Sequence, residues 1–282
     1  MKNIFSSYGR FIPLAVLALI GMILIPLPAL LLDILAILVI IFSFLIIYRS
    51  ISTKRSMDFS LLPSCLLILT LLNLVIQVSF TRLILTQGES FKGMIIRLIT
   101  SILTISGGTA GLITCLIIYA SLTFAIGYFL VRGVVRAGEV AARFYIDALP
   151  GRLMAIEAEY NSGKITEEEA NIRKENLQKE LDFYGALDGA GKFISGNFKA
   201  SIIITFLCIF GGFIICIAAN GIIFSSETLE NGNFFIIMTI STGSLKSLVL
   251  GYIPFSIANG LLSIFFVLIA CMTMSLHSSK FK

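Results

Sequence analysis

Long runs of apolar residues alternate with short polar segments along this chain of 282 residues. The apolar runs cover residues 11–32, 34–48, 59–80, 108–131 and 200–219, and a last tract covers 234–276. About 20 apolar residues in a helix cross the hydrocarbon core of a bilayer, and most of these runs come close to that length. The pattern predicts an all-α integral membrane protein with about six transmembrane helices.

Two boundaries between these runs are less clear. Asp33 separates the first two runs, so we expect a helical hairpin that turns at Asp33, or nearer Pro28 because the second run is short. The last tract is too long for one straight crossing, and its glycines and proline predict a re-entrant piece near 234–250 before the final helix. Two full crossings there would instead place the C-terminus outside.

Residues 132–199 form a charged island with 10 basic and 11 acidic side chains, in which apolar residues recur at helical spacing. Pro150 and Gly151 predict a break in its first helix. Thr166, followed three residues later by Glu169, predicts a capping box at the start of the next helix. We therefore divide the chain into a four-helix membrane region (1–131), a helical cytoplasmic insertion (132–199) and a C-terminal membrane region (200–282).

Composition supports a lipid environment. The chain is 57% hydrophobic and 13% charged, with a mean hydropathy of +0.98, which is more apolar than a soluble domain of this length. The net charge of +5 arises outside the nearly neutral island. It lies at the flanks of the apolar runs, where basic residues set membrane orientation, so we expect a lipid bilayer and no nucleic acid as partner. If six helices cross the membrane and the other basic flanks face the cytoplasm, Arg82, Lys92 and Arg97 lie at the outer face as exceptions.

Few residues offer chemistry. The cysteines lie inside apolar segments without a CxxC pair, and His277, the one histidine, lies near the C-terminal edge. The sequence shows no nucleophile–base pair, no phosphate-binding glycine loop and no metal cluster. It therefore predicts no enzyme activity, no cofactor and no metal. The cysteines are Cys65, Cys115, Cys208, Cys216 and Cys271.

Several long stretches resemble one family. They are FYIDALPGRLMAIEAE within the island, MILIPLPALLLDIL at 22–35, MDFSLLPSCLLILTLLNLVIQVSFTRLIL at 57–85 and IFGGF at 209–213. They closely resemble the FHIPEP family of membrane proteins from flagellar and type III secretion export. The resemblance implies a homo-oligomeric ring, nonameric in known members, in the bacterial inner membrane. Its partners would be other export-gate membrane proteins and the exported proteins.

The resemblance also implies roles for individual residues. Arg82 matches the arginine of the family's STR motif, and Asp188 and Lys192 match the aspartate and lysine of its MDGAxKF motif, which implies gating or proton coupling. Asp188 and Lys192 are spaced to share one face of a helix. The spacing alone fits equally well with a surface ion pair worth less than about 1 kcal/mol. The loop motif itself matches at Arg143, Asp147, Pro150, Gly151, Met154, Glu157, Glu159 and Gly163.

The chain departs from the family at three positions. Asn73 stands where an arginine is usual, and Asn197 and Thr242 stand where carboxylates are usual. An amide or a hydroxyl does not take up a proton at physiological pH as a carboxylate does. If those family carboxylates relay protons, this chain has lost that chemistry or moved it.

Two other functions stay open at this point. The missing carboxylates also fit a degenerate paralogue that only scaffolds membrane partners, or a small-solute or ion transporter. The resemblance implies a large cytoplasmic domain after the membrane half, whereas the sequence reaches only Lys282. A shortened paralogue and a fragment both agree with that, and the sequence does not separate a flagellar system from an injectisome.

Overall fold

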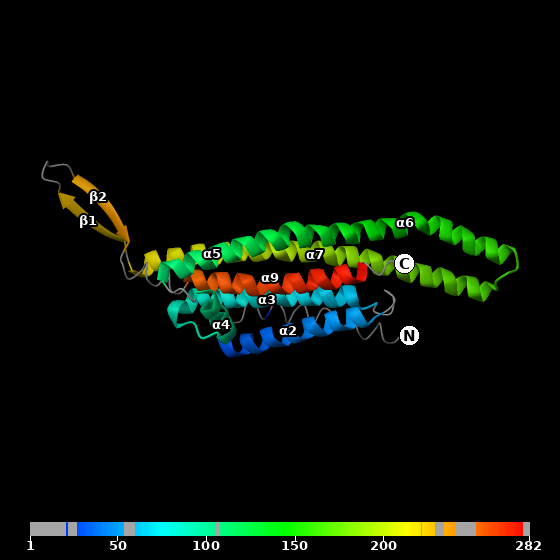
Figure 1. Ribbon diagram of the computed structural model, residues 1–282, viewed down its shortest axis with the longest axis horizontal. Coiled ribbons are helices and arrows are strands. Elements are labelled where there is room, and N and C mark those ends of the chain that lie inside the picture. The colour runs from blue at the N-terminus through cyan, green and yellow to red at the C-terminus, as the bar shows by residue number, and fades with distance from the viewer. Residues whose placement is uncertain are drawn as a thin grey trace. The chain divides into compact units, whose positions relative to one another are not determined.

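The computed structural model describes Gly21 and residues 27–53, 60–104, 108–220, 222–228, 234–240 and 252–278 (Figure 1). The chain forms two compact units. The first consists of residues 1–38, 72–123 and 199–264, and the second of residues 39–71, 124–198 and 265–282. Because several helices contribute residues to both units, each unit is described by itself.

The described part is helical except for one pair of strands, which confirms the all-α class. Five of its helices are long and apolar enough to cross a membrane. Most of the first predicted run, 11–32, lies outside the described residues. The helices are α2 (Ala29–Ser52), α3 (Leu62–Gln87), α4 (Met94–Leu103), α5 (Gly108–Ala125), α6 (Arg132–Asn161), α7 (Glu167–Asn220) and α9 (Ile253–Ser278), with a 3-10 turn at Gly88–Ser90 and a π-helix at Ile126–Val131.

Large apolar side chains are exposed along these helices. Leu30 of α2 is 71% exposed, Ile117 of α5 is 63% exposed and Phe206 of α7 is 66% exposed. An apolar surface on this scale is unusual for a protein surrounded by water, whereas lipid covers it without cost. The exposure therefore agrees with the membrane environment that composition predicts.

The predicted turn at Asp33 is wrong, because Asp33 lies inside the first turns of α2. The helix begins at Ala29, directly after Pro28, which was the alternative boundary. Asp33 is nearly buried and accepts hydrogen bonds from the backbone N–H groups of Met94 (2.7 Å, to Oδ2) and Ile95 (3.2 Å, to Oδ1). Its carboxylate thus caps the N-terminus of α4, where unpaired N–H groups and the helix dipole favour a negative charge.

The core of the first unit combines aromatic packing with polar contacts. Phe80 of α3 and Phe255 of α9 pack on either side of Phe91, with ring centroids 6.3 Å and 5.4 Å from that ring. Phe91 precedes α4 and is fully buried. The aromatic cluster and the Asp33 cap together fix α4 against α2, α3 and α9.

The last apolar tract is divided in the structure. Strand β1 (Ile222–Thr228) pairs antiparallel with β2 (Phe234–Ile240), in a register that places Ile222 opposite Ile240. A two-stranded hairpin has open edges whose backbone groups need water, so it does not suit the hydrocarbon core. Residues 234–240 thus form a strand and residues 241–251 lie outside the described part, so the re-entrant piece stays a prediction, while the final helix is confirmed as α9.

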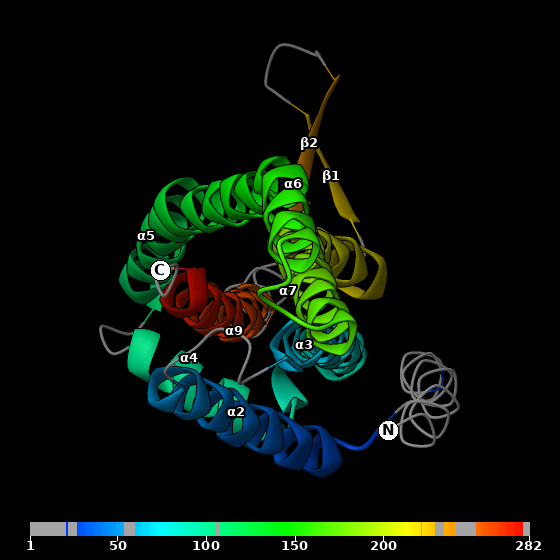
Figure 2. The ribbon, with the colours of Figure 1, turned by 90° about the vertical axis from the view of Figure 1, so that its right-hand side faces the viewer.

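In the second unit, α6 and the first part of α7 form an antiparallel helical hairpin, and Figures 1 and 2 show the two helices side by side. The predicted capping box is confirmed at the start of α7. Thr166 Oγ1 accepts from the Glu169 N–H at 3.2 Å, and Glu169 Oε2 accepts from the Thr166 N–H at 3.3 Å. The helical character of the island is confirmed as well.

The turn of this hairpin depends on Gly163. Its φ of +73° lies in the left-handed region, which glycine adopts without steric cost. The Gly163 N–H donates to the Tyr160 carbonyl at 3.0 Å, and the Lys164 N–H donates to the Glu159 carbonyl at 3.1 Å. These two bonds form a Schellman motif, which ends α6 and turns the chain toward α7.

The predicted break at Pro150 and Gly151 is wrong, because α6 continues through both residues. A proline inside a helix removes one backbone hydrogen bond, so the helix needs support from its neighbours. On one side of Pro150, Tyr145 stacks on Tyr184 of α7 with ring centroids 4.1 Å apart. On the other side, Arg152 pairs with Glu180 of α7 at 3.3 Å. Contacts with α7 thus support α6 on both sides of the proline.

Candidate functional site

The residues predicted from the MDGAxKF motif form an ion pair on α7. Lys192 Nζ lies 2.7 Å from Asp188 Oδ2, and the two residues are one helical turn apart. The pair is asymmetric, because the Asp188 side chain is 18% exposed and the Lys192 side chain is 61% exposed. The carboxylate therefore lies at the packed side of the helix, while the ammonium group reaches outward.

One oxygen of Asp188 has no partner in the described part of the protein. Oδ1 is buried and accepts no hydrogen bond there, while Oδ2 accepts from Lys192. A buried carboxylate oxygen without a donor is costly. A hydrogen-bond donor that reached Oδ1 would therefore lower this cost.

Two glycines, Gly138 of α6 and Gly191 of α7, leave space for a side chain of α9 next to this part of α7, and we call them the glycine notch. A Cβ atom at Gly138 of α6 would lie 2.5 Å from Met274 Cε, and a Cβ atom at Gly191 of α7 would lie 2.7 Å from the same atom. Met274 of α9 is fully buried. The two glycines thus make room for one methionine, and α6, α7 and α9 meet beside Asp188.

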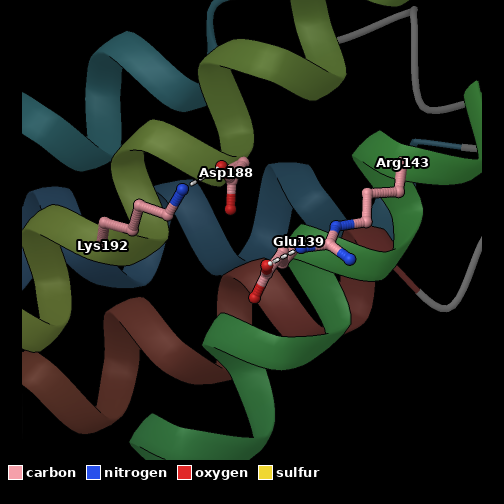
Figure 3. A network of polar contacts seen from close by, with 4 residues as sticks. All are labelled: Glu139, Arg143, Asp188 and Lys192. Atoms are coloured by element: carbon pink, nitrogen blue, oxygen red, sulfur yellow. Dashed lines mark hydrogen bonds and ion pairs between the residues drawn. The ribbon is translucent and has the colours of Figure 1, made fainter. Parts of the chain in front are cut away.

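A second ion pair on α6 lies near the first. Arg143 Nη2 is 2.8 Å from Glu139 Oε1, and both side chains are exposed to solvent. Figure 3 shows the two pairs on facing turns of α6 and α7, with both carboxylates between the two basic groups in that view. We call Glu139, Arg143, Asp188 and Lys192 the four-charge cluster. The structure brings Arg143 into this cluster, whereas the loop motif gave no reason to group it with Asp188.

The other residues of the loop motif hold the hairpin rather than join the cluster. Glu157 pairs with Lys174 at 3.1 Å, and Glu159 pairs with Arg173 at 2.6 Å, so both carboxylates link α6 to α7. Gly163 forms the turn described above. The four remaining motif residues are exposed on α6: Asp147, Pro150, Gly151 and Met154.

The remaining predicted residues lie elsewhere. Arg82 is exposed on α3 and belongs to the first unit. Thr242 lies outside the described residues. Asn197 is 4% exposed, and neither of its amide atoms has a hydrogen-bond partner in the described part. The position at which the family resemblance leads us to expect a carboxylate is therefore buried in this chain.

Asn73 has a defined structural partner. It is 1% exposed, and its Nδ2 donates to Ser263 Oγ of α9 at 2.9 Å. An arginine of the family type would bring a charge and a longer side chain into this buried position. The neutral amide instead makes a compact bond between α3 and α9.

Sequence reasoning missed a larger set of polar contacts around Asn73. Gln77 Nε2 donates to Ser201 Oγ of α7 at 2.9 Å, and Asn259 Nδ2 of α9 donates to Thr81 Oγ1 at 3.1 Å. Asn73, Gln77 and Thr81 recur every four residues on α3. That spacing inside an apolar run was a readable signal of a buried polar face. We call these side chains, with Ser263, the polar seam of the first unit.

No group of three or more histidine, cysteine, aspartate or glutamate side chains suited to a metal occurs among the residues that the structure describes. The four-charge cluster holds only two carboxylates, each already near a basic side chain.

The fold and the four-charge cluster together define a class of protein: a multi-helix membrane protein in which α6 and the first part of α7 form a charged helical hairpin. The chain belongs to the FHIPEP family, whose model matches residues 19–262. It is 43% identical to the flagellar biosynthesis protein FlhA of Borreliella burgdorferi, over 79% of this chain and 31% of that protein. It is 39% identical to FlhA of Treponema pallidum (88% and 34%) and 35% identical to FlhA of Bacillus subtilis (86% and 34%).

The chain thus spans about a third of the length of these relatives. A comparison with solved structures found none that matches.

Proposed function

We propose that this chain is a membrane component of a flagellar or type III protein export apparatus in the bacterial inner membrane. The observation that carries the proposal is the FHIPEP match over residues 19–262, together with relatives named as flagellar biosynthesis proteins. The five membrane-length helices support the location. The basic residues at the flanks of the apolar runs support a cytoplasmic position for the insertion at 132–199.

We further propose that the four-charge cluster takes part in gating. The cluster lies where α6, α7 and α9 meet, so a change in the charge of Asp188 acts on the packing of three helices. The unpartnered Oδ1 of Asp188 supports this role, because it can accept a further hydrogen bond. Arg82 is the second gating candidate, supported by its match to the family motif.

The resemblance to the family supports partners of three kinds: other export-gate membrane proteins, exported proteins and further copies of this chain in a ring. Electron microscopy of the protein extracted from native membranes tests the ring. A particle made of one copy of this chain, with no other export component, would contradict this part of the proposal.

The gating proposal is tested by substitution in the bacterium that carries the gene. Asp188→Asn keeps the shape of the side chain and removes its charge. We expect secretion of flagellar or type III substrates into the medium to fall by about tenfold, the effect of ~1.4 kcal/mol. Glu175→Gln is the matched control, because Glu175 and Lys179 form a one-turn ion pair of 2.8 Å on the same helix with both side chains exposed.

The outcomes separate gating from scaffolding. Loss of secretion with Asp188→Asn but not with Glu175→Gln, at equal protein levels in the membrane, supports gating. Normal secretion with both variants would exclude a gating role for Asp188. If deletion of the gene then still abolishes secretion, the chain acts as a scaffold for its partners.

A further inference from the structure

Helix α4 carries an apolar stripe on its exposed side. Met94, Leu98 and Ile102 are 73%, 54% and 59% exposed and follow one another at one-turn spacing. The opposite side of the helix is packed, since Ile96 is 0% exposed and Thr100 is 8% exposed. Apolar residues of α4 therefore lie on its exposed side as well as on its packed side.

Cationic side chains border this stripe. At about 100° per residue, Arg97 lies roughly 60° from Met94 around the helix, beside Ser101, and both are exposed. Lys92, just before the helix, is exposed as well. Arg97 and Lys92 are two of the three residues, with Arg82, that the positive-inside rule left as exceptions at the outer face. A structural role for α4 in lipid would account for both exceptions.

The depth of α4 follows from its cap. The ten residues of α4 span about 15 Å, which is too short to cross a hydrocarbon core of about 30 Å. Asp33 binds the first two N–H groups of α4 and lies within the first turns of α2, a helix long enough to span the membrane. The end of a spanning helix lies at the lipid headgroups, so the start of α4 is held there too.

We propose that α4 is an interfacial helix that binds anionic phospholipid. Met94, Leu98 and Ile102 enter the acyl-chain border, while Lys92 and Arg97 contact the headgroup phosphates. An apolar stripe with a cationic edge is the pattern of helices that lie in the membrane plane. Because each cation near an anionic surface gains attraction, anionic lipid is enriched by up to about fivefold per cationic side chain.

The chain contains no tryptophan, so one introduced tryptophan reports on a single place. We would purify Leu98→Trp and reconstitute it into vesicles of phosphatidylethanolamine and phosphatidylcholine that contain a fixed fraction of either brominated phosphatidylglycerol or brominated phosphatidylcholine. Bromine on the acyl chain quenches tryptophan on contact. Ile102→Trp repeats the measurement on the same stripe if Leu98→Trp does not fold. Tyr160→Trp, at the end of the α6–α7 hairpin, is the control outside the lipid.

We expect strong quenching of Leu98→Trp and little quenching of Tyr160→Trp. Brominated phosphatidylglycerol should quench Leu98→Trp several times more than brominated phosphatidylcholine. Adding Lys92→Gln and Arg97→Gln should make the two lipids equal without abolishing quenching. Absence of quenching by both lipids would show that protein covers α4, and equal quenching in the unaltered background would show no selection for anionic lipid. Either result overturns the proposal.

Discussion

The two units of this protein place polar groups in membrane-length helices in opposite ways. In the first unit the polar seam is neutral and buried, and its amides bond to hydroxyl groups on other helices, as Gln77 does to Ser201 at 2.9 Å. In the second unit the side-chain pairs on α6 and α7 are ion pairs, and most of them are exposed. The contrast follows from solvation, since a neutral amide is desolvated at modest cost and a charge is not.

Asp188 is the exception that links this contrast to function. Among the described ion pairs of the second unit it is the most buried member, with 18% of its side chain exposed. Asp188 forms an ion pair, as the side chains of the hairpin do, but it is largely buried, as the side chains of the polar seam are. The comparison therefore singles out Asp188 without using the family motif.

The largest expected effect comes from filling the glycine notch. Gly191→Leu forces a side chain onto Met274, and overpacking of this kind costs about 1–3 kcal/mol. We expect a clear drop in the unfolding temperature of the purified protein in detergent. Met274→Ala should restore much of the loss in the double variant. Gly189→Leu on the same helix is the control, because a Cβ atom there has no heavy atom within 4 Å. Equal losses for both variants would show that helix propensity, and not the notch, is responsible.

A smaller effect is expected in the polar seam. In a double-mutant cycle of Gln77→Leu and Ser201→Ala, we expect a coupling of about 0.6 kcal/mol, the average for hydrogen bonds between membrane helices, and no more than about 1.7 kcal/mol. The coupling should not change with salt, because both groups are neutral. Reversible unfolding in mixed detergent micelles measures it. A coupling near zero would mean that each helix finds other partners for these groups.

The smallest effect is expected for the hairpin ion pairs. The cycle of Glu159→Gln and Arg173→Gln should give less than about 1 kcal/mol, since both partners are roughly half exposed. This coupling should fall further as salt rises, because ions screen exposed charges. Unfolding at low and high salt tests it. A coupling that is large and independent of salt would place the pair with Asp188 and not with the exposed pairs.

The sequence by itself determined what depends on local pattern. The apolar runs located most of the membrane-length helices that the structure describes, the spacing of Thr166 and Glu169 located a capping box, and the long motif of the island gave the family. These features depend on residues within a few positions of each other, where helix geometry alone fixes the neighbours.

Tertiary structure decided which distant groups meet. The carboxylate of Asp33 caps a helix that begins 61 residues later, and Asn73 bonds to a serine 190 residues away. Pro150 does not break α6, because α7 supports the helix on both sides of it. Asp188 is packed where three helices converge, although its spacing to Lys192 fits a surface pair equally well. The local periodicity of a sequence does not determine which helices pack against each other. Burial and long-range partners therefore follow only from the tertiary packing.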